Sequence, residues 1–380
     1  MTVPALSGRA PVPAALDISG WIAHWAQWTP GKTALRFEGR CVSYAELARA
    51  VQRAAARLAA SGVSRGDRVA YLGPNCPELL ELLFACARLG AIFVPLNTRM
   101  PTAELRVFLA ATRPRLVVAE TGFRDTALAS AGRDGHDRVV TFADTADPEA
   151  CADGAERVRA DPGPDLAAPV LILFTSGTTG PPKGATFTQE NMTFNALNVI
   201  TAFGLTAADE ILTAVPMFHS GGLFIHTTPG LCAGATVTIH RQFDPGLLLA
   251  DVQRHRVTLL ACVPAMTLAL AAHPDWDRAD LSSLRSVLTG STFVPRGAVE
   301  PWQRRGIPVM QGYGSTEACP VATSLPPGSP GELALTAGKP LLYHRVRIVD
   351  AAGRDVLNST FENTAVSTTS LSCEHMPMPT

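Results

Sequence analysis

Short apolar runs alternate with longer amphipathic stretches along most of the chain, and this alternation constrains the fold more than any other feature. Residues 68–72 and 91–96 have the length and the branched side chains of buried strands, and the apolar stretch 77–89 between them indicates a helix. Strands that are separated by helices usually pair in parallel, because the helix returns the chain to the same end of the sheet. The sequence therefore predicts an α/β fold of mostly parallel sheets with helices packed around them.

The pattern weakens over residues 122–166, which are rich in Asp, Gly, Ala and Pro and which we interpret as a surface connection between two lobes. We place these lobes at approximately 15–165 and 166–335. Near the start, residues 34–42 predict a hairpin that turns at Glu38-Gly39, and Ser43 and Glu46 form a capping box that begins a helix running to about residue 60. Further strands are expected at 115–120, 170–174, 211–215, 235–239, 257–263, 286–288 and 307–310, with a helix at 245–255.

The end of the chain differs in composition from the rest. Residues 358–380 contain nine Ser or Thr and neither Arg nor Gly, although the preceding chain is rich in both. We therefore predict one domain over residues 1–356, with a small, partly formed β region near its end, and a divergent, disordered tail over residues 357–380.

Charge and cysteine content exclude several classes of protein. The 32 Lys and Arg balance 33 Asp and Glu, so no excess of basic charge favours nucleic acid or an anionic membrane as the main partner. The eight cysteines are scattered, mostly in apolar runs, which predicts reduced thiols in a cytoplasmic protein rather than a disulfide framework or a zinc site. The most apolar segment, 257–272, is too short to span a bilayer and contains Pro264. No membrane span and no secretory signal are expected.

The strongest chemical motif directly follows the apolar strand at 170–174. Residues 173–184 read Leu-Phe-Thr-Ser-Gly-Thr-Thr-Gly-Pro-Pro-Lys-Gly. The glycines let main-chain N–H groups approach an anion, and the hydroxyls and the Lys183 cation complete what looks like a phosphate cradle. A plain surface turn is the alternative that composition favours. The ordinary P-loop is excluded, because no Gly-Lys-Ser/Thr follows the glycine pair.

This motif resembles the phosphate loop of the AMP-forming acyl-CoA synthetases, which are relatives of firefly luciferase and of peptide-synthetase adenylation domains. Two further segments occur in the family's order. Residues 216–222, Pro-Met-Phe-His-Ser-Gly-Gly, resemble the segment beside the acyl pocket, and residues 311–318, Gln-Gly-Tyr-Gly-Ser-Thr-Glu-Ala, resemble the segment that holds adenine, phosphate and magnesium. The resemblance covers roughly residues 15–355 and implies the large N-terminal domain of an adenylate-forming ligase.

The resemblance implies a role for each matching residue. Tyr313 would stack on adenine, Thr316 would contact the α-phosphate, and Glu317 and Thr178 would lie at Mg²⁺. His219 would lie at the carboxylate end of the acyl pocket, so that His219, Thr316 and Glu317 form the expected catalytic set. The remaining nucleotide contacts implied are Thr175, Ser176, Gly177, Thr179, Gly180, Lys183, Gly290, Ser291, Thr292, Gln311, Gly312, Gly314 and Ser315.

Each of these residues also has an interpretation without function. Tyr313 is alternatively a core tyrosine, although a glycine on each side leaves little reason for packing. An isolated Glu317 would more often be a solvated surface residue. His219 stands among apolar residues, where a core histidine with satisfied hydrogen bonds is the default interpretation.

The resemblance implies ATP-dependent conversion of a carboxylic acid to an acyl-adenylate, followed by transfer to coenzyme A, with ATP and Mg²⁺ as cofactors. After Glu317 the likeness is brief, and no Thr-Gly-Asp occurs downstream to bind the ribose. We find no counterpart of the C-terminal lid or its lysine, so we expect the lid to be absent and the activity impaired. A degenerate nucleotide- or acyl-binding protein without turnover, and an adenylating enzyme that uses an amine or carrier protein, stay open as alternatives. An apolar pocket lining favours a fatty or aryl acid as the substrate. For the oligomeric state, a homodimer is possible alongside a monomer.

Overall fold

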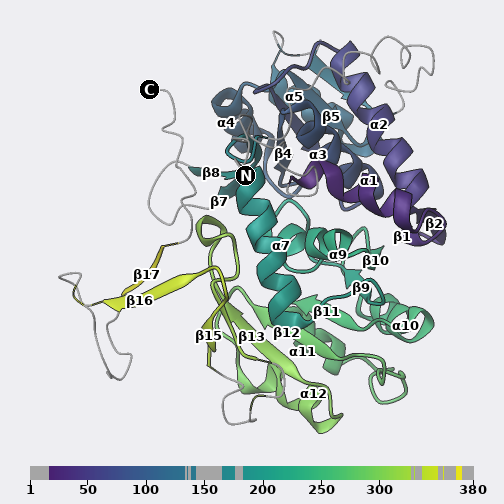
Figure 1. Cartoon of the computed structure of the whole chain (residues 1–380), viewed down its shortest axis with the longest axis vertical. Helices are drawn as coiled ribbons and strands as arrows, with labels where there is room; N and C mark the ends of the chain where they lie inside the picture. The colour runs from purple at the N-terminus through teal and green to yellow at the C-terminus, as the bar shows by residue number, and fades with distance from the viewer. Residues whose placement is uncertain are drawn as a thin grey trace, which may run out of the picture.

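The computed structural model describes residues 17–132, 135, 138–142, 165–175, 183–326, 329, 336–349 and 354, and the backbone of residues 365–369. These residues form two large sheets with helices on their faces, and a two-stranded arm that projects from the body (Figure 1). The predicted α/β class with mostly parallel sheets is confirmed.

The first sheet has six strands in the order β6-β5-β3-β4-β7-β8. The first five are mutually parallel, and only β8 runs antiparallel to its neighbour β7. The strands are β6 Val139–Thr141, β5 Leu116–Ala119, β3 Arg68–Leu72, β4 Ile92–Leu96, β7 Pro169–Thr175 and β8 Lys183–Thr188. The helices in this part of the chain are α2 Tyr44–Ala60, α3 Pro77–Leu89, α4 Thr102–Thr112, η2 Thr121–Phe123 and α5 Arg124–Ala131, of which α2 packs on β1 and β2.

The second sheet has nine strands in the order β15-β14-β13-β12-β11-β9-β10-β1-β2. Its centre, from β13 to β1, is parallel, whereas the pairings at both ends are antiparallel. The strands are β1 Thr33–Phe37, β2 Arg40–Ser43, β9 Glu210–Thr213, β10 Thr236–Ile239, β11 Leu259–Cys262, β12 Ser286–Gly290, β13 Val309–Tyr313, β14 Thr323–Ser324 and β15 Lys339–Pro340. The helices around it are α1 Ile18–Trp28, α7 Gln189–Phe203, α8 Ser220–Phe224, α9 Thr227–Ala233, α10 Pro245–His255, α11 Pro264–Ala271, η4 Arg296–Ala298, α12 Glu300–Arg304 and η5 Thr316–Ala318.

Local sequence signals produce the expected local structure. Glu38 and Gly39 both have positive φ, 47° and 79°, which is the geometry of a two-residue turn that matches the twist of the hairpin strands. The Ser43–Glu46 capping box is present at the start of α2. The predicted helices at 77–89 and 245–255 coincide with α3 and α10.

Sheet membership does not follow the lobe boundary expected near residue 165. The β1–β2 hairpin from the first part of the chain completes the nine-stranded sheet, and β7 and β8 from the second part complete the six-stranded sheet. Aromatic side chains then join the sheets through a shared core. Phe187 of β8 packs 4.8 Å, between ring centroids, from Phe224 of α8. The two sheets are therefore held in a fixed relation at the place where the sequence motifs meet.

The tail differs from the expectation of disorder at one place. Residues Ala365–Thr369 form β17, which pairs antiparallel with β16, Arg345–Val349, in the projecting arm of Figure 1. Strand pairing uses main-chain hydrogen bonds, which an apolar periodicity in the sequence does not reveal. The rest of the tail lies outside the described residues. Within the described ranges, no helix combines the length and the apolar character that crossing a bilayer requires.

Candidate active site

The phosphate-loop motif connects the two antiparallel strands at the edge of the six-stranded sheet. Thr175 ends β7 and Lys183 begins β8, and the two residues are register partners. The Thr175 hydroxyl donates to the Lys183 carbonyl oxygen at 3.4 Å, and the Lys183 side chain is exposed. Residues 176–182, and with them Ser176, Gly177, Thr178, Thr179 and Gly180, lie outside the described residues. The structure therefore locates both ends of the predicted cradle at one hairpin.

The acyl-side motif lies between β9 and α8. His219 is the N-cap residue of α8, and its side chain is exposed, so the interpretation as a core histidine is wrong. Desolvation by surrounding protein atoms, and secondarily the positive charge of Arg99, lower the pKa of His219. A neutral imidazole can accept or donate a hydrogen bond without adding positive charge. The hydroxyl of the next residue, Ser220, lies 3.0 Å from the hydroxyl of Thr316.

The third motif leaves the sheet at the end of β13 and forms the short turn η5. The chain then returns closely beside itself, since the Ala322 N–H donates to the Tyr313 carbonyl at 2.9 Å. Gly314 allows this approach, because a Cβ at this position would lie 1.7 Å from the Pro320 carbonyl oxygen. The return places Thr316 against the acyl-side motif, as described above.

The ends of β12 and β13 form the expected adenine side of the site. These strands are parallel neighbours, and their carboxyl ends carry Gly290 opposite Gly312. A Cβ on Gly290 would lie 2.4 Å from the Gly312 carbonyl oxygen, so the close packing of the strand ends requires a glycine. Ser291 and Thr292 follow in an exposed turn, in which Ser291 has a left-handed φ of 73°.

Two polar atoms at these strand ends have no hydrogen-bond partner among the residues that the structure describes. They are Gln311 Oε1 and Thr289 Oγ1, and both are buried. Gln311 and Thr289 are also register partners on neighbouring strands. Tyr313 lies two residues beyond Gln311, on the same side of the strand, and is 39% exposed, so its interpretation as a core tyrosine is wrong. Within the described ranges, two unpartnered side-chain oxygens and an exposed ring therefore lie at one edge of the sheet.

Glu317, the residue expected at the metal, lies in the turn η5. Its carboxylate is partly buried and forms no hydrogen bond or ion pair with the described residues. Those residues also contain no group of three or more His, Cys, Asp or Glu placed to hold an ion. Mg²⁺ suits such a place, because it commonly binds one or two carboxylates and takes its other ligands from water and substrate phosphates.

Buried asparagines of α7 contact α8, the residue after η5 and the segment 343–344, a feature that the sequence reasoning missed. The side chain of Asn195 donates to the Phe224 carbonyl of α8 at 2.8 Å. The carbonyl of Asn191 accepts from the Cys319 thiol, 3.4 Å away, just after η5. Asn198 holds the segment 343–344, which contacts η5 from the other side. Their spacing of four and three residues places them on one face of a helix, a signal that ordinarily indicates a solvated surface.

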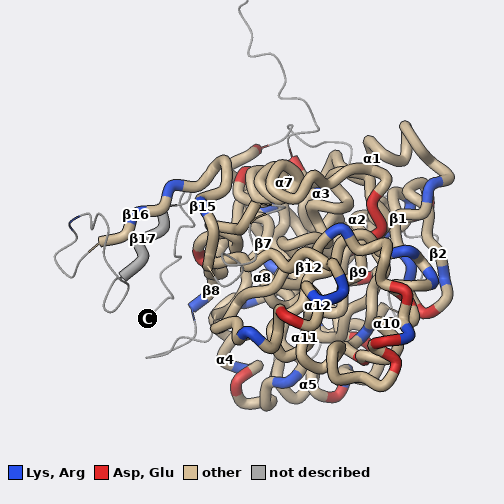
Figure 2. The backbone as a smooth tube through the Cα atoms, turned by 90° about the horizontal axis from the view of Figure 1, so that it is seen from below, with Lys and Arg blue, Asp and Glu red and all other residues tan. Residues whose placement is uncertain are grey.

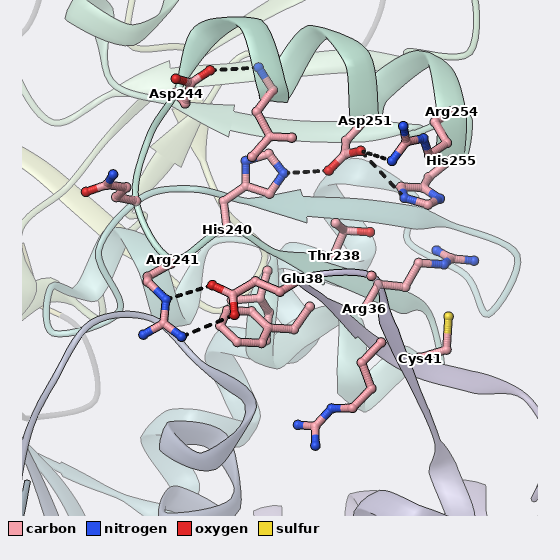
Figure 3. A pocket seen from close by; sticks show the side chains of 16 residues that line it. Arg36, Glu38, Cys41, Thr238, His240, Arg241, Asp244, Asp251, Arg254 and His255 are labelled. Carbon is pink, nitrogen blue, oxygen red and sulfur yellow. Dashed lines mark hydrogen bonds and ion pairs between the residues drawn. The ribbon is translucent and has the colours of Figure 1, made fainter. Parts of the chain in front are cut away.

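A cavity lies elsewhere on the nine-stranded sheet, between the β1–β2 hairpin, the end of β10 and α10 (Figure 3). It has a volume of about 760 Å³, and none of the described sequence-predicted site residues lines it. Figure 3 shows His240 facing Asp251 and Arg241 facing Glu38. The His240 Nε2 atom lies 2.9 Å from Asp251 Oδ2. Charges of both signs also lie side by side at this end of the molecule in Figure 2. The arginines that line the cavity all form ion pairs with carboxylates; they are Arg36, Arg40, Arg241 and Arg254.

Comparisons with known proteins agree with the motifs. Residues 22–360 match the family model described as "AMP-binding enzyme". The chain is 44% identical to the indoleacetate–CoA ligase of Aromatoleum aromaticum, over 90% of this chain and 68% of that protein. It is 40% identical to the feruloyl-CoA synthase of an Amycolatopsis species, over 89% of this chain and 67% of the relative.

A solved structure shows the same architecture. The N-terminal domain of FACL13 from Mycobacterium tuberculosis superposes with a TM-score of 0.79 at 26% identity, over 90% of this chain and 86% of that one. The strand order, the three motifs and these similarities agree with one another. This chain belongs to the AMP-binding enzyme family and is a member of the adenylate-forming acid–CoA ligases.

Proposed function

We propose that this protein uses ATP to convert an aromatic carboxylic acid to an acyl-adenylate and then transfers the acyl group to coenzyme A. One observation carries the proposal: the 3.0 Å contact between the hydroxyls of Ser220 and Thr316. It joins the segment expected to bind the acid to the segment expected to bind the α-phosphate. Carboxylate and phosphorus must meet at one point for adenylation, and positioning supplies much of the catalysis of such a displacement.

The relatives support the aromatic class of acid. Indoleacetate and ferulate, which give two of these ligases their names, both carry an aromatic ring near the carboxylate. The neutral, exposed His219 suits the carboxylate end of such a substrate, because it can donate a hydrogen bond there. Relatives named for 2-succinylbenzoate, at 32% identity, extend the same chemistry to an acid with two carboxylates.

The nucleotide would lie across the ends of the two sheets. We assign the adenine to Tyr313 and the free oxygen of Gln311, with the Gly290–Thr292 turn beside it. The phosphates would lie between the loop from Thr175 to Lys183 and Thr316. Magnesium would neutralise phosphate charge, and Glu317 is the residue of this chain that would hold it, together with Thr178.

The compartment and the acceptor belong to the same proposal. All six described cysteines are free thiols, which supports a reducing cytoplasm. Coenzyme A is the acceptor named for the relatives, whereas transfer to an amine or a carrier protein stays an alternative. Gel filtration of the purified chain tests the homodimer alternative.

The test is ATP–pyrophosphate exchange with a panel of aryl and fatty acids, followed by thioester formation with coenzyme A. We expect exchange with arylacetic and arylacrylic acids, and a loss of exchange in Glu317→Ala. The matched control is Glu104→Ala, which removes an exposed glutamate of α4 and should leave exchange unchanged. The same assay tests the expectation that these 380 residues alone adenylate slowly.

Each outcome has a separate meaning. Exchange without thioester would exclude coenzyme A as acceptor, and exchange with fatty acids alone would exclude the aromatic class. Nucleotide binding without any exchange, even at high enzyme concentration, would favour a binding protein without turnover. Equal losses of Mg·ATP and metal-free AMP affinity in Glu317→Ala would refute the metal role.

A further inference from the structure

The inference concerns His344, a residue outside every sequence motif. Its side chain is buried between α7 and the turn η5, which carries Thr316 and Glu317. The Nε2 atom lies 2.9 Å from the Ala318 carbonyl oxygen, and the Nδ1 atom lies 2.9 Å from the side-chain nitrogen of Asn198. His344 is therefore a bridge between a long helix and the last residue of η5.

The hydrogen-bond partners determine which ring nitrogen carries the hydrogen. The Ala318 carbonyl only accepts, so Nε2 of His344 must be the donor. The side-chain oxygen of Asn198 accepts from the Tyr343 N–H at 2.9 Å, which orients the amide so that its NH₂ group faces the ring. Since this NH₂ group only donates, Nδ1 must be the acceptor. His344 is thus held as one neutral tautomer with both ring nitrogens satisfied.

The turn that His344 contacts needs such support. It consists of the three residues Thr316–Ala318, and Cys319 follows in a left-handed conformation with a φ of 60°. A non-glycine residue in that region is strained, so surrounding contacts must hold it. Ser220 holds Thr316, and His344 holds Ala318 from the α7 side. Glu317 lies between these two contacts.

We propose that His344 is a positioning residue that fixes the direction of the Glu317 carboxylate for Mg·ATP. The inference rests on the proposed function, because it assumes that Glu317 meets the metal. A one-residue displacement of a short turn redirects its side chains, and a misplacement of about 1 Å at a reacting group can lower a rate by about 100-fold. The donor to Ala318 is the essential bond, whereas the acceptor for Asn198 orients the ring.

Two substitutions separate these bonds. His344→Gln places an amide NH₂ where Nε2 was, so the bond to Ala318 is retained and the bond to Asn198 is lost. His344→Asn places an oxygen where Nδ1 was, so it retains the bond to Asn198 and loses the bond to Ala318. Each variant loses one buried hydrogen bond, so we expect similar decreases in the thermal midpoint.

The rate of adenylation should differ between His344→Asn and His344→Gln, although their thermal midpoints should be similar. In ATP–pyrophosphate exchange we expect kcat to fall by about 10- to 100-fold in His344→Asn and by less than about threefold in His344→Gln, with the KM for the acid unchanged. By calorimetry, His344→Asn should bind Mg·ATP more weakly and metal-free AMP normally. Equal rates in the two variants, or rates that follow the thermal midpoints, would overturn the inference.

A measurement on the unaltered chain covers the case in which a variant does not fold. If the His344 bridge favours Mg·ATP binding, bound Mg·ATP must stabilise the bridge in return. Mg·ATP should therefore slow the solvent exchange of the His344 Nε2–H, which can be observed by NMR with ¹⁵N-labelled histidine. Unchanged exchange in the presence of bound Mg·ATP would overturn the inference and leave the proposed function intact. An unaltered chain that binds no Mg·ATP would overturn both.

Discussion

The buried His226 leads us to predict how the free energy of unfolding of this protein changes in acid. The imidazole is fully buried, stands edge-on to Phe203 at 5.5 Å between ring centroids, and has no hydrogen-bond partner on either nitrogen among the described residues. Burial lowers its pKa from 6.5 to about 4, because a charged ring would lose its hydration. The folded state therefore keeps His226 neutral at a pH where the unfolded chain is protonated.

The sign and size of the effect follow from these two pKa values. Between pH 6.5 and pH 4 the unfolded state binds more protons, so the free energy of unfolding falls as the pH falls. The full difference corresponds to about 3 kcal/mol, and the change between pH 7 and pH 5 is about 2 kcal/mol. This is a sizeable share of the stability of an ordinary domain.

A second group, the half-buried Glu81, opposes this effect and hides it in the unaltered protein. Burial, followed by the nearby Glu78, raises the pKa of Glu81 to about 7. The folded state therefore binds the additional proton between pH 4.5 and pH 7, and acidification from pH 7 to pH 5 raises the stability, also by about 2 kcal/mol. We expect the two contributions nearly to cancel.

The assay is urea unfolding at pH 7 and pH 5 of the unaltered chain, His226→Phe and Glu81→Gln. Relative to the unaltered chain, His226→Phe should gain about 2 kcal/mol when the pH is lowered, and Glu81→Gln should lose about as much. The two substitutions serve as controls for each other, because a general effect of acid would move both in one direction. A His226→Phe difference that is the same at both pH values would refute the assignment of a buried neutral histidine.

Three further predictions concern the site. Tyr313→Ala should weaken AMP binding by about 1–3 kcal/mol in calorimetry, and Tyr313→Phe should not, because the stacking face is retained. Equal losses of AMP affinity in the two variants would refute the assignment of adenine to the Tyr313 ring. Gly314→Ala should abolish nucleotide binding with little change in far-UV circular dichroism, since its Cβ would lie 1.7 Å from the Pro320 carbonyl oxygen; normal AMP affinity would show that η5 can rearrange. Ser220→Ala removes the bond to Thr316 and should lower kcat for pyrophosphate exchange by about two- to tenfold. An unchanged kcat would show that this contact does not contribute to adenylation.

Tertiary pairing explains why some expectations and the structure differ. The β1 strand pairs with β10, about two hundred residues later, and the sequence near residue 165 carries no mark of that pairing. Each large sheet therefore takes strands from both sides of that position. The apolar neighbours of His219 made a core histidine the alternative interpretation of that residue, whereas its side chain is exposed at the N-cap of α8.

The positioning contacts of the site were also invisible in the sequence. Asn198 and His344 are 146 residues apart and belong to no motif. A buried asparagine on a helix has the same spacing as a solvated one, and only the packing partners distinguish them. The motifs could be identified because each is a short local stretch, whereas the residues that contact them are distributed over the chain.

The sequence by itself determined the elements and the chemistry of this protein. Apolar periodicity, capping residues and turn glycines act over a few residues, so the helices at 77–89 and 245–255, the Glu38-Gly39 turn and the three motifs could be identified without coordinates. Only the tertiary structure decided which motifs meet: the contact of Ser220 with Thr316 and the bridge from Asn198 through His344 to Ala318. Such contacts depend on the joint packing of two sheets around one core, a long-range effect that no short stretch of sequence records.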